Sequence, residues 1–180
     1  MPELPSGTVT FLFTDVEGHT AVMDRLGDAR GRALLREVEL LTRAALRAHG
    51  GDEVKSLGDG VMATFLSAHA ALECAVELQQ ALSDSSGTAE DNEELPLRIR
   101  VGINAGEPIA ENDDYFGQAV IVASRVASLA LGGEILVTNV VRELAAGSRL
   151  TFADRGAHLL RGLESPARIW ALEWAERPDA

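Results

Sequence analysis

Two short acidic turns carry residue types that bind divalent metal ions. The first follows the apolar run Val9–Thr14, where Asp15 stands at the end of a predicted strand and Gly18 opens a turn into a helical pattern. A carboxylate at a strand end, beside the free N–H groups of a helix N-terminus, suits a cation and the phosphate that it neutralises. The simpler interpretation is that Asp15 and Thr20 only cap the helix, and this stretch alone leaves both open.

The second turn is Leu57-Gly58-Asp59-Gly60, between the strand candidates Asp52–Ser56 and Val61–Leu66. A glycine on each side of an aspartate indicates a tight hairpin, and an ordinary turn is the simpler interpretation. In a split βαβ sheet the first strand is central and this hairpin runs beside it, so Asp15 and Asp59 could share one or two Mg²⁺ ions. Two-metal phosphoryl transfer needs such a pair of carboxylates.

Three further charged residues could contact a nucleotide. Lys55 precedes the second turn, Asp114 stands at the mouth of a predicted helix, and Arg125 lies within that helix among small apolar neighbours. Lys55 on a solvated face and Asp114 as an N-cap are the ordinary interpretations; alternatively they present one donor and one acceptor, the pattern that matches the adenine edge. An arginine at such a helical position is costly unless it is paired, so Arg125 fits a phosphate or an interface carboxylate.

Composition excludes several other functions. The net charge of −12 argues against a nucleic-acid partner, because phosphate backbones require clustered Lys and Arg. Cys74 is the only cysteine, and the four histidines show no metal-ligand spacing. The N-terminus lacks the pattern of a signal peptide, and no apolar run approaches the roughly 20 residues that span a bilayer. These features predict a cytoplasmic protein without a membrane partner.

Hydrophobic periodicity predicts the elements that position these residues. A broken helix is expected over residues 20–49, and an acidic loop over about 84–94. The other expected elements are strands Thr8–Thr14, Leu97–Asn104, Glu134–Thr138, Leu150–Ala153, Ala157–Leu160 and Ala167–Trp174, and helices Ala68–Leu82, Tyr115–Leu131 and Asn139–Ala146. Their order predicts one α+β domain spanning 1–180, with a core of about 7–174. Its sheet is ferredoxin-like (split βαβ) and mainly antiparallel, with helices packed on one face.

Taken together, the motifs resemble the class III nucleotidyl cyclases, the adenylate and guanylate cyclase catalytic domain. The similarity covers about Gly7 to Trp174 and rests on these segments: Phe13-Thr14-Asp15-Val16-Glu17-Gly18-His19-Thr20, Lys55-Ser56-Leu57-Gly58-Asp59-Gly60, Gly102-Ile103-Asn104-Ala105-Gly106-Glu107, Asp114-Tyr115-Phe116-Gly117, Ala123-Ser124-Arg125, Gly133-Glu134-Ile135-Leu136-Val137-Thr138 and Leu160-Arg161-Gly162-Leu163. Seven motifs in one order are far more specific than any one of them.

The resemblance implies an adenylate cyclase that converts ATP to 3′,5′-cyclic AMP and pyrophosphate. It implies that two divalent ions, Mg²⁺ or Mn²⁺, are held by Asp15, Asp59 and the carbonyl of Val16. By the same resemblance the other roles are phosphate binding by Glu17, Gly18, His19 and Thr20, adenine selection by Lys55, Asp114 and Tyr115, charge stabilisation by Arg125, and a triphosphate contact from Arg161, where the family often has lysine. A homodimer is implied, because the metal aspartates come from one chain and the base and transition-state residues from the other.

One position departs from the family pattern. Four residues before Arg125 the family usually has an asparagine that hydrogen-bonds the ribose, and this chain has Ile121. Losing one transition-state donor costs about 10²–10³ in rate, so a weak or silent nucleotide-binding and dimerisation module is the alternative to a working enzyme. A second alternative, a diguanylate cyclase, rests on Gly50-Gly51-Asp52-Glu53-Val54. It is disfavoured because a long helical pattern runs directly into that segment.

Overall fold

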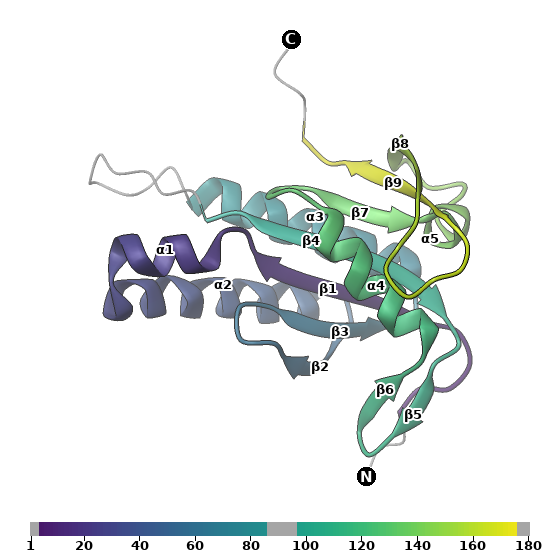
Figure 1. Cartoon of the computed structure of the whole chain (residues 1–180), viewed down its shortest axis with the longest axis horizontal. Coiled ribbons are helices and arrows are strands. Elements are labelled where there is room, and N and C mark those ends of the chain that lie inside the picture. The colour runs from purple at the N-terminus through teal and green to yellow at the C-terminus, as the bar shows by residue number, and fades with distance from the viewer. Residues whose placement is uncertain (1–3, 86–96, 176–180) are drawn as a thin grey trace.

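The computed structural model describes residues 4–85 and 97–175. β1 (Val9–Val16) lies inside a seven-stranded sheet of order β2-β3-β1-β4-β7-β9-β8 (Figure 1). Its residues are mostly β-branched or aromatic, which favours a buried strand, and only Asp15 is not buried. β1 pairs in antiparallel fashion with β3 (Val61–Phe65) and β4 (Ile99–Gly106). β4 pairs in parallel with β7 (Ile135–Thr138). The expected α+β fold with a mainly antiparallel sheet is confirmed.

The outer strands differ in part from expectation. β2 (Asp52–Ser56) and β9 (Ala167–Glu173) lie close to their predicted bounds. The two strands predicted over 150–160 form one strand, β8 (Thr151–His158), whose pairing with β9 shifts register between Asp154 and Ala157. An irregularity of this kind inserts unpaired residues without ending the strand, which explains why the pattern looked like two strands.

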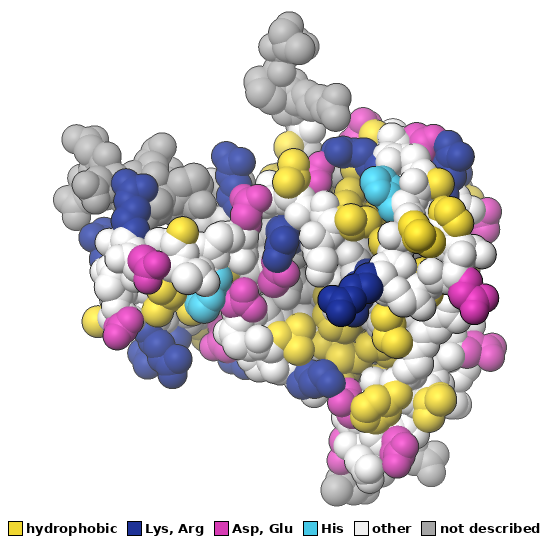
Figure 2. Space-filling view, viewed as in Figure 1, with side chains coloured by type: hydrophobic (Ala, Val, Ile, Leu, Met, Phe, Trp, Pro, Cys, Tyr) yellow, Lys and Arg dark blue, Asp and Glu magenta, His cyan; other side chains and the backbone are white. Residues whose placement is uncertain are grey.

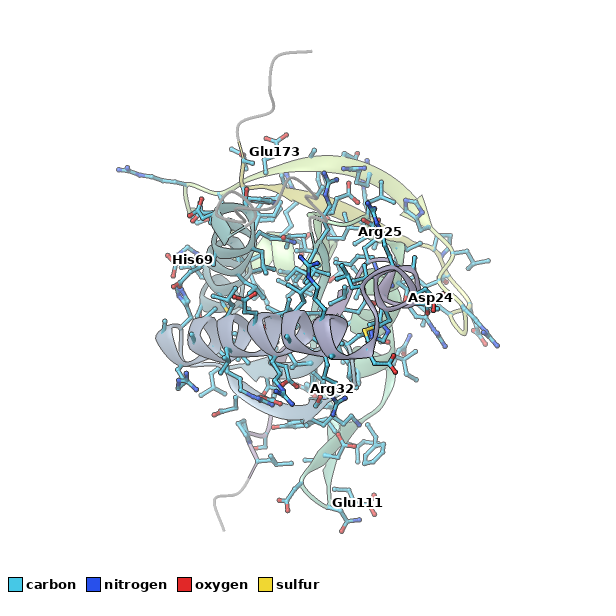
Figure 3. All side chains as sticks on the ribbon, turned by 90° about the vertical axis from the view of Figure 1, so that its left-hand side faces the viewer. Asp24, Arg25, Arg32, His69, Glu111 and Glu173 are labelled. Atoms are coloured by element: carbon cyan, nitrogen blue, oxygen red, sulfur yellow. The ribbon has the colours of Figure 1, made fainter. Side chains whose placement is uncertain are left out.

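A small hairpin replaces the first turn of a predicted helix. β5 (Ile109–Glu111) and β6 (Asp114–Phe116) form a separate two-stranded sheet. Its turn consists of Asn112 and Asp113, both with positive φ, which these residue types tolerate best after glycine. The helix predicted from Tyr115 therefore starts later, as α4 (Gln118–Leu129) after Gly117. Figure 3 shows Glu111 at the outer end of the hairpin, away from the body of the molecule.

The remaining helices match the predicted pattern. The N-terminal helical segment breaks at Gly27 (φ 80°) into α1 (His19–Leu26) and α2 (Asp28–Ala48). α3 (Ala68–Ser85) and α5 (Asn139–Leu144) follow β3 and β7. Most of the acidic loop predicted over about 84–94 lies outside the described residues. Within the described part of the chain, no helix is long and apolar enough to cross a membrane.

Helices cover both faces of the sheet. Leu12 and Val16 belong to a core that also contains buried residues of α2, α3 and α5. Phe11 and Phe13 point to the other side, into a smaller core with Ala123 of α4. In Figure 1, α4 lies in front of the sheet and α2 and α3 behind it. The prediction placed the helices on one face, and α4 is the exception to it.

α4 lies unusually close to the sheet because β4 has glycines beneath it. A Cβ built on Gly102 would lie 2.1 Å from the backbone nitrogen of Ala127, and one on Gly106 would lie 2.8 Å from the Cβ of Ala119. The buried amide of Asn104, between these glycines, donates to the carbonyl of Ala119 at 3.0 Å. Small residues on both surfaces thus fix α4 over β1 and β4.

Candidate active site

The predicted metal ligand Asp15 makes a two-pronged ion pair. Side chains alternate along a strand, so Asp15 lies on the same face as Phe11 and Phe13, the face that α4 covers. Its register partner on β4 is Arg100. The Arg100 guanidinium donates from Nε to Oδ1 at 2.5 Å and from Nη2 to Oδ2 at 2.7 Å. Paired bonds of this kind fix the plane of a carboxylate as well as its charge partner.

Three carboxylates act on this one guanidinium. The pKa of Arg100 is raised, mainly by the hydrogen bond to Asp15 and further by the charges of Asp15, Glu17 and Asp59, while burial opposes the rise. Sequence reasoning missed Arg100, because an arginine alternating with apolar residues looked like the solvated side of a strand. Only the pairing register of β1 with β4 places it opposite Asp15.

The turn that carries Asp59 is held against the end of β1. The N–H of Leu57 closes the turn on the carbonyl of Gly60 at 2.8 Å. The N–H of Val61 donates to the buried hydroxyl of Thr14 at 3.1 Å. Gly60 is required here, because a Cβ on it would lie 1.7 Å from the carbonyl oxygen of Thr14. The two acidic turns are therefore neighbours, and Asp59 lies near the guanidinium that binds Asp15.

The predicted phosphate turn begins a helix. Gly18 has φ 64° and caps α1, whose first-turn N–H groups have no acceptor within the helix and suit an anion. The N–H of Glu17 differs, since it already donates to the carbonyl of Arg98 at 2.8 Å. α1 contains no buried residue and packs on α2, where Met23 lies against Gly31. The donors available to phosphate thus start after Glu17.

Two of the three residues predicted to select adenine, Lys55 and Asp114, are in direct contact. Lys55 Nζ donates to Asp114 Oδ2 at 2.6 Å. This bond is the main reason that the pKa of Asp114 is lowered, and the N–H of Tyr115, 2.8 Å from Oδ1, contributes to the shift. The Tyr115 side chain is itself buried. Its ring packs edge-on against Phe11, and its hydroxyl donates to the carbonyl of Pro5 at 3.3 Å. Tyr115 thus anchors the hairpin and orients Asp114 through its backbone.

α4 carries the predicted transition-state positions. Arg125 has a buried Nε with no hydrogen-bond partner, the one such side-chain atom in the described residues. Buried donors are nearly always paired, so the Arg125 guanidinium lacks a partner that such a position normally has. Ile121, one turn earlier, is 47% exposed and so lies at the surface rather than in the core. Arg161 is exposed in the loop between β8 and β9, and no described contact joins it to the other predicted site residues.

The donor set fits a hard divalent cation. No group of three or more His, Cys, Asp or Glu side chains is already arranged as a metal site in the described ranges. Asp15 and Asp59 nevertheless supply carboxylate oxygens, which Mg²⁺ and Mn²⁺ prefer, and the Val16 carbonyl is adjacent to Asp15 in the chain. The guanidinium on Asp15 shows that this carboxylate already holds a cation.

The sheet, its two acidic turns and the Lys55–Asp114 pair define a nucleotidyl cyclase catalytic domain. The family model for the adenylate and guanylate cyclase catalytic domain matches residues 1–173, and the chain belongs to this family. The diguanylate alternative is wrong on the fold as well. Gly50 and Gly51 connect α2 to β2 and do not form the turn of a β-hairpin.

Individual relatives agree with this assignment. A putative adenylate cyclase 3 from Rhizobium meliloti (strain 1021) is 32% identical over 174 residues, which are 94% of this chain and 28% of that protein. The chain therefore spans just over a quarter of that relative. An adenylate/guanylate cyclase/hydrolase from Silicibacter pomeroyi has a TM-score of 0.79 at 31% identity, covering 92% of this chain and 95% of that one. Trypanosoma brucei adenylate cyclases, solved in their monomeric state, give a TM-score of 0.81 at 28% identity, covering 95% of this chain and 91% of that one.

Proposed function

We propose that this chain is an adenylate cyclase, which converts ATP to 3′,5′-cyclic AMP and pyrophosphate with two divalent ions at a homodimer interface. The observation that carries the proposal is the Lys55–Asp114 contact at 2.6 Å on the same face of the molecule as the Asp15 pair. Lys55 lies opposite Met62, which belongs to the core beneath α4. If two chains pair through this face, the base-selecting pair of one chain would lie opposite the metal carboxylates of the other, as a nucleotide with a bound ion requires.

Asp15, Asp59 and the Val16 carbonyl would hold the ions, Mg²⁺ or Mn²⁺. Bound ions would lower the pKa of the ribose 3′-hydroxyl and neutralise the triphosphate. Gly18, His19 and Thr20 would donate backbone N–H groups to the phosphates. Lys55 would donate to a ring nitrogen of adenine, and Asp114 would accept from its exocyclic amine.

Arg125 and Arg161, together with the base-selecting Lys55–Asp114 pair, would complete the site from the neighbouring chain. Arg125 has an unpaired buried Nε, and a guanidinium placed beside the reacting phosphate stabilises the charge that develops there. Arg161 would supply a second cation toward the triphosphate. In this arrangement each chain contributes to two sites, and one chain alone cannot react.

A second copy of the chain is the partner that this surface fits. Ile109, Phe116 and Ile121 are 63%, 49% and 47% exposed, and they come from the β5–β6 hairpin and the start of α4. Figure 2 shows apolar side chains gathered on this face, with charged side chains around them. Apolar groups exposed together near a functional site are typical of an interface.

Ile121 supports a second candidate, a nucleotide-binding and dimerisation module with little or no turnover. An exposed isoleucine at that place on α4 offers no hydrogen bond to a ribose. The two candidates differ in product, because both bind ATP and only the enzyme releases cyclic AMP and pyrophosphate.

The deciding experiment is incubation with ATP and Mn²⁺, followed by mass analysis for cyclic AMP. The proposed function predicts product from the unaltered chain, none from Asp15→Asn or Asp59→Asn, and unchanged product from Asp52→Asn, an exposed aspartate at the start of β2. ATP binding without product would favour the module. Equal turnover in all variants would exclude the assigned metal ligands.

A further inference from the structure

The carboxylate assigned to the divalent ion is already occupied by a cation of the protein. Both oxygens of Asp15 accept hydrogen bonds from Arg100, at 2.5 and 2.7 Å. The Arg100 side chain is only 29% exposed and the Asp15 side chain only 23%, so water screens their charges incompletely. An ion that binds Asp15 must therefore displace the guanidinium or lie beside it against strong repulsion.

A displaced Arg100 has limited alternatives within the chain. Glu17 and Asp59 are the other carboxylates whose charges act on it, and the same ion would draw on Asp59. A metal ion that arrives alone on Asp15 and Asp59 thus leaves Glu17 as the one remaining carboxylate among these three for the guanidinium. A metal ion that arrives with a polyphosphate brings further acceptors for the guanidinium with it.

We propose that Arg100 is a positioning residue that makes divalent-ion binding at Asp15 depend on nucleotide. In the nucleotide-free protein it holds Asp15 in its binding orientation and offsets part of the negative charge of Asp15, Glu17 and Asp59. Nucleotide removes the cost of displacing it, so nucleotide and ion each raise the affinity for the other, and by linkage both effects have the same size. This inference rests on the proposed function, because it takes Asp15 as the metal ligand.

A purely structural pair would behave in the opposite way. Cross-strand ion pairs stabilise a sheet, and an arginine that only orients Asp15 would weaken ion binding when removed. Displacement predicts that removing Arg100 strengthens ion binding in the absence of nucleotide. The sign of the change therefore separates the two roles.

The test measures Mn²⁺ affinity by electron paramagnetic resonance of the free ion, with and without a non-cyclisable ATP analogue. Arg100→Gln should bind Mn²⁺ alone more tightly, by a factor within the roughly 5- to 150-fold range of such couplings. The gain in Mn²⁺ affinity that the analogue produces should shrink by the same factor.

The chain offers a matched control. Arg43 on α2 makes a similar two-pronged pair with Glu53, at 2.8 and 3.2 Å. Glu53 pairs with Ala63 of the core beneath α2 and α3, so this pair lies on the face away from Asp15. Arg43→Gln should leave both Mn²⁺ affinities unchanged.

Several outcomes would overturn the proposal. The first is that Arg100→Gln binds Mn²⁺ no more tightly than the unaltered chain does. The second is that the double variant Arg100→Gln with Asp15→Asn still binds Mn²⁺ tightly. The third is that the unaltered chain binds no Mn²⁺ even with the analogue. If Arg100→Gln fails to fold, Arg100→Lys can replace it, because lysine keeps the charge but cannot make the two-pronged pair. This variant should still bind Mn²⁺ alone more tightly than the unaltered chain does. Coupled binding of Mn²⁺ and nucleotide without formation of cyclic AMP would support the role of Arg100 and refute the proposed enzymatic activity.

Discussion

Lys55 Nζ lies 2.6 Å from Asp114 Oδ2, although 59 positions separate the two residues in the chain. They belong to different sheets, since Lys55 is on β2 and Asp114 begins β6 of the small hairpin. The contact holds the hairpin against the large sheet, and it sets one donor beside one acceptor. A preformed pair reduces the ordering cost of binding a base.

Asp114→Asn should lower kcat/KM for ATP and reduce discrimination against GTP. A hydrogen bond to a charged group contributes about 1.5–3 kcal/mol, which predicts a loss of about 10- to 150-fold in steady-state assays with the two nucleotides. Asp113→Asn is the control, because Asp113 is an exposed turn residue with φ 59° and asparagine tolerates that conformation. Equal losses in both variants would contradict the role of Asp114.

The same pair predicts a pH dependence. The Lys55 hydrogen bond lowers the pKa of Asp114 below its usual 3.8. A carboxylate whose pKa is depressed in the folded protein stabilises it above the unfolded pKa, and this is lost as pH falls through the folded value. The ¹³C carboxyl resonance of Asp114 should therefore stay constant from pH 8 to pH 5 and titrate below 3.8. In Lys55→Met its midpoint should move upward.

Mixing Asp15→Ala chains with Arg125→Ala chains should restore activity that neither variant has alone. In a mixed pair one of the two sites combines an intact Asp15 with an intact Arg125 from the other chain. Cyclic AMP formation is measured after chain exchange, which fluorescence transfer between labelled chains verifies. A mixture that exchanges chains and stays inactive would refute the composite site.

Ile121→Asn should raise kcat with little effect on folding. Ile121 is 47% exposed, so the new amide stays hydrated in the free chain and avoids the penalty of a buried unpaired group. A ribose donor that acts as charge develops would increase kcat by up to about 10²-fold. An already active enzyme that does not change would mean that another group holds the ribose. If the variant binds ATP but forms no cyclic AMP, the nucleotide-binding and dimerisation module would be favoured.

Gly102→Ala should destabilise the domain and displace α4. The added Cβ would lie 2.1 Å from the backbone nitrogen of Ala127, and backbone cannot yield as a flexible side chain can. Overpacking of this kind typically costs about 1–3 kcal/mol, which thermal denaturation measures. Ser128→Ala, an exposed position on the same helix, should change stability by no more than about 0.5 kcal/mol. If Gly102→Ala leaves the stability unchanged, the close contact between β4 and Ala127 is not what fixes the position of α4.

The sequence predicted those elements whose local residue pattern matches their position in the fold. β1, β2 and β3 lie near their expected bounds, because buried apolar runs and the glycines around Asp59 define them. The start of α4 was misplaced, because the helical pattern continues back through Tyr115. Its burial comes from contact with Phe11, not from a helix. The hairpin depends on the left-handed turn at Asn112 and Asp113, which composition does not distinguish from an acidic loop.

The candidate site was predictable as two separate halves. The acidic turns and the Lys55–Asp114 pair could be read from residue types, since each lies in a recognisable local pattern. Arg100 could not, because its role depends on the register of two strands that are 85 residues apart at this pair. The unpaired Nε of Arg125 likewise appears only when α4 is packed against the sheet.

The helix proposed to present N–H groups to phosphate contributes no residue to the hydrophobic cores of the described structure. α1 has no buried residue, and the glycines at its two ends, Gly18 and Gly27, both have positive φ. Segments with so little buried surface open at low free energy. Asp15 thus lies on a buried strand, whereas the proposed phosphate donors lie on a helix with little buried surface. If nucleotide binds as proposed, part of the free energy released would be used to order α1, and the affinity would be lower than the final contacts alone would give.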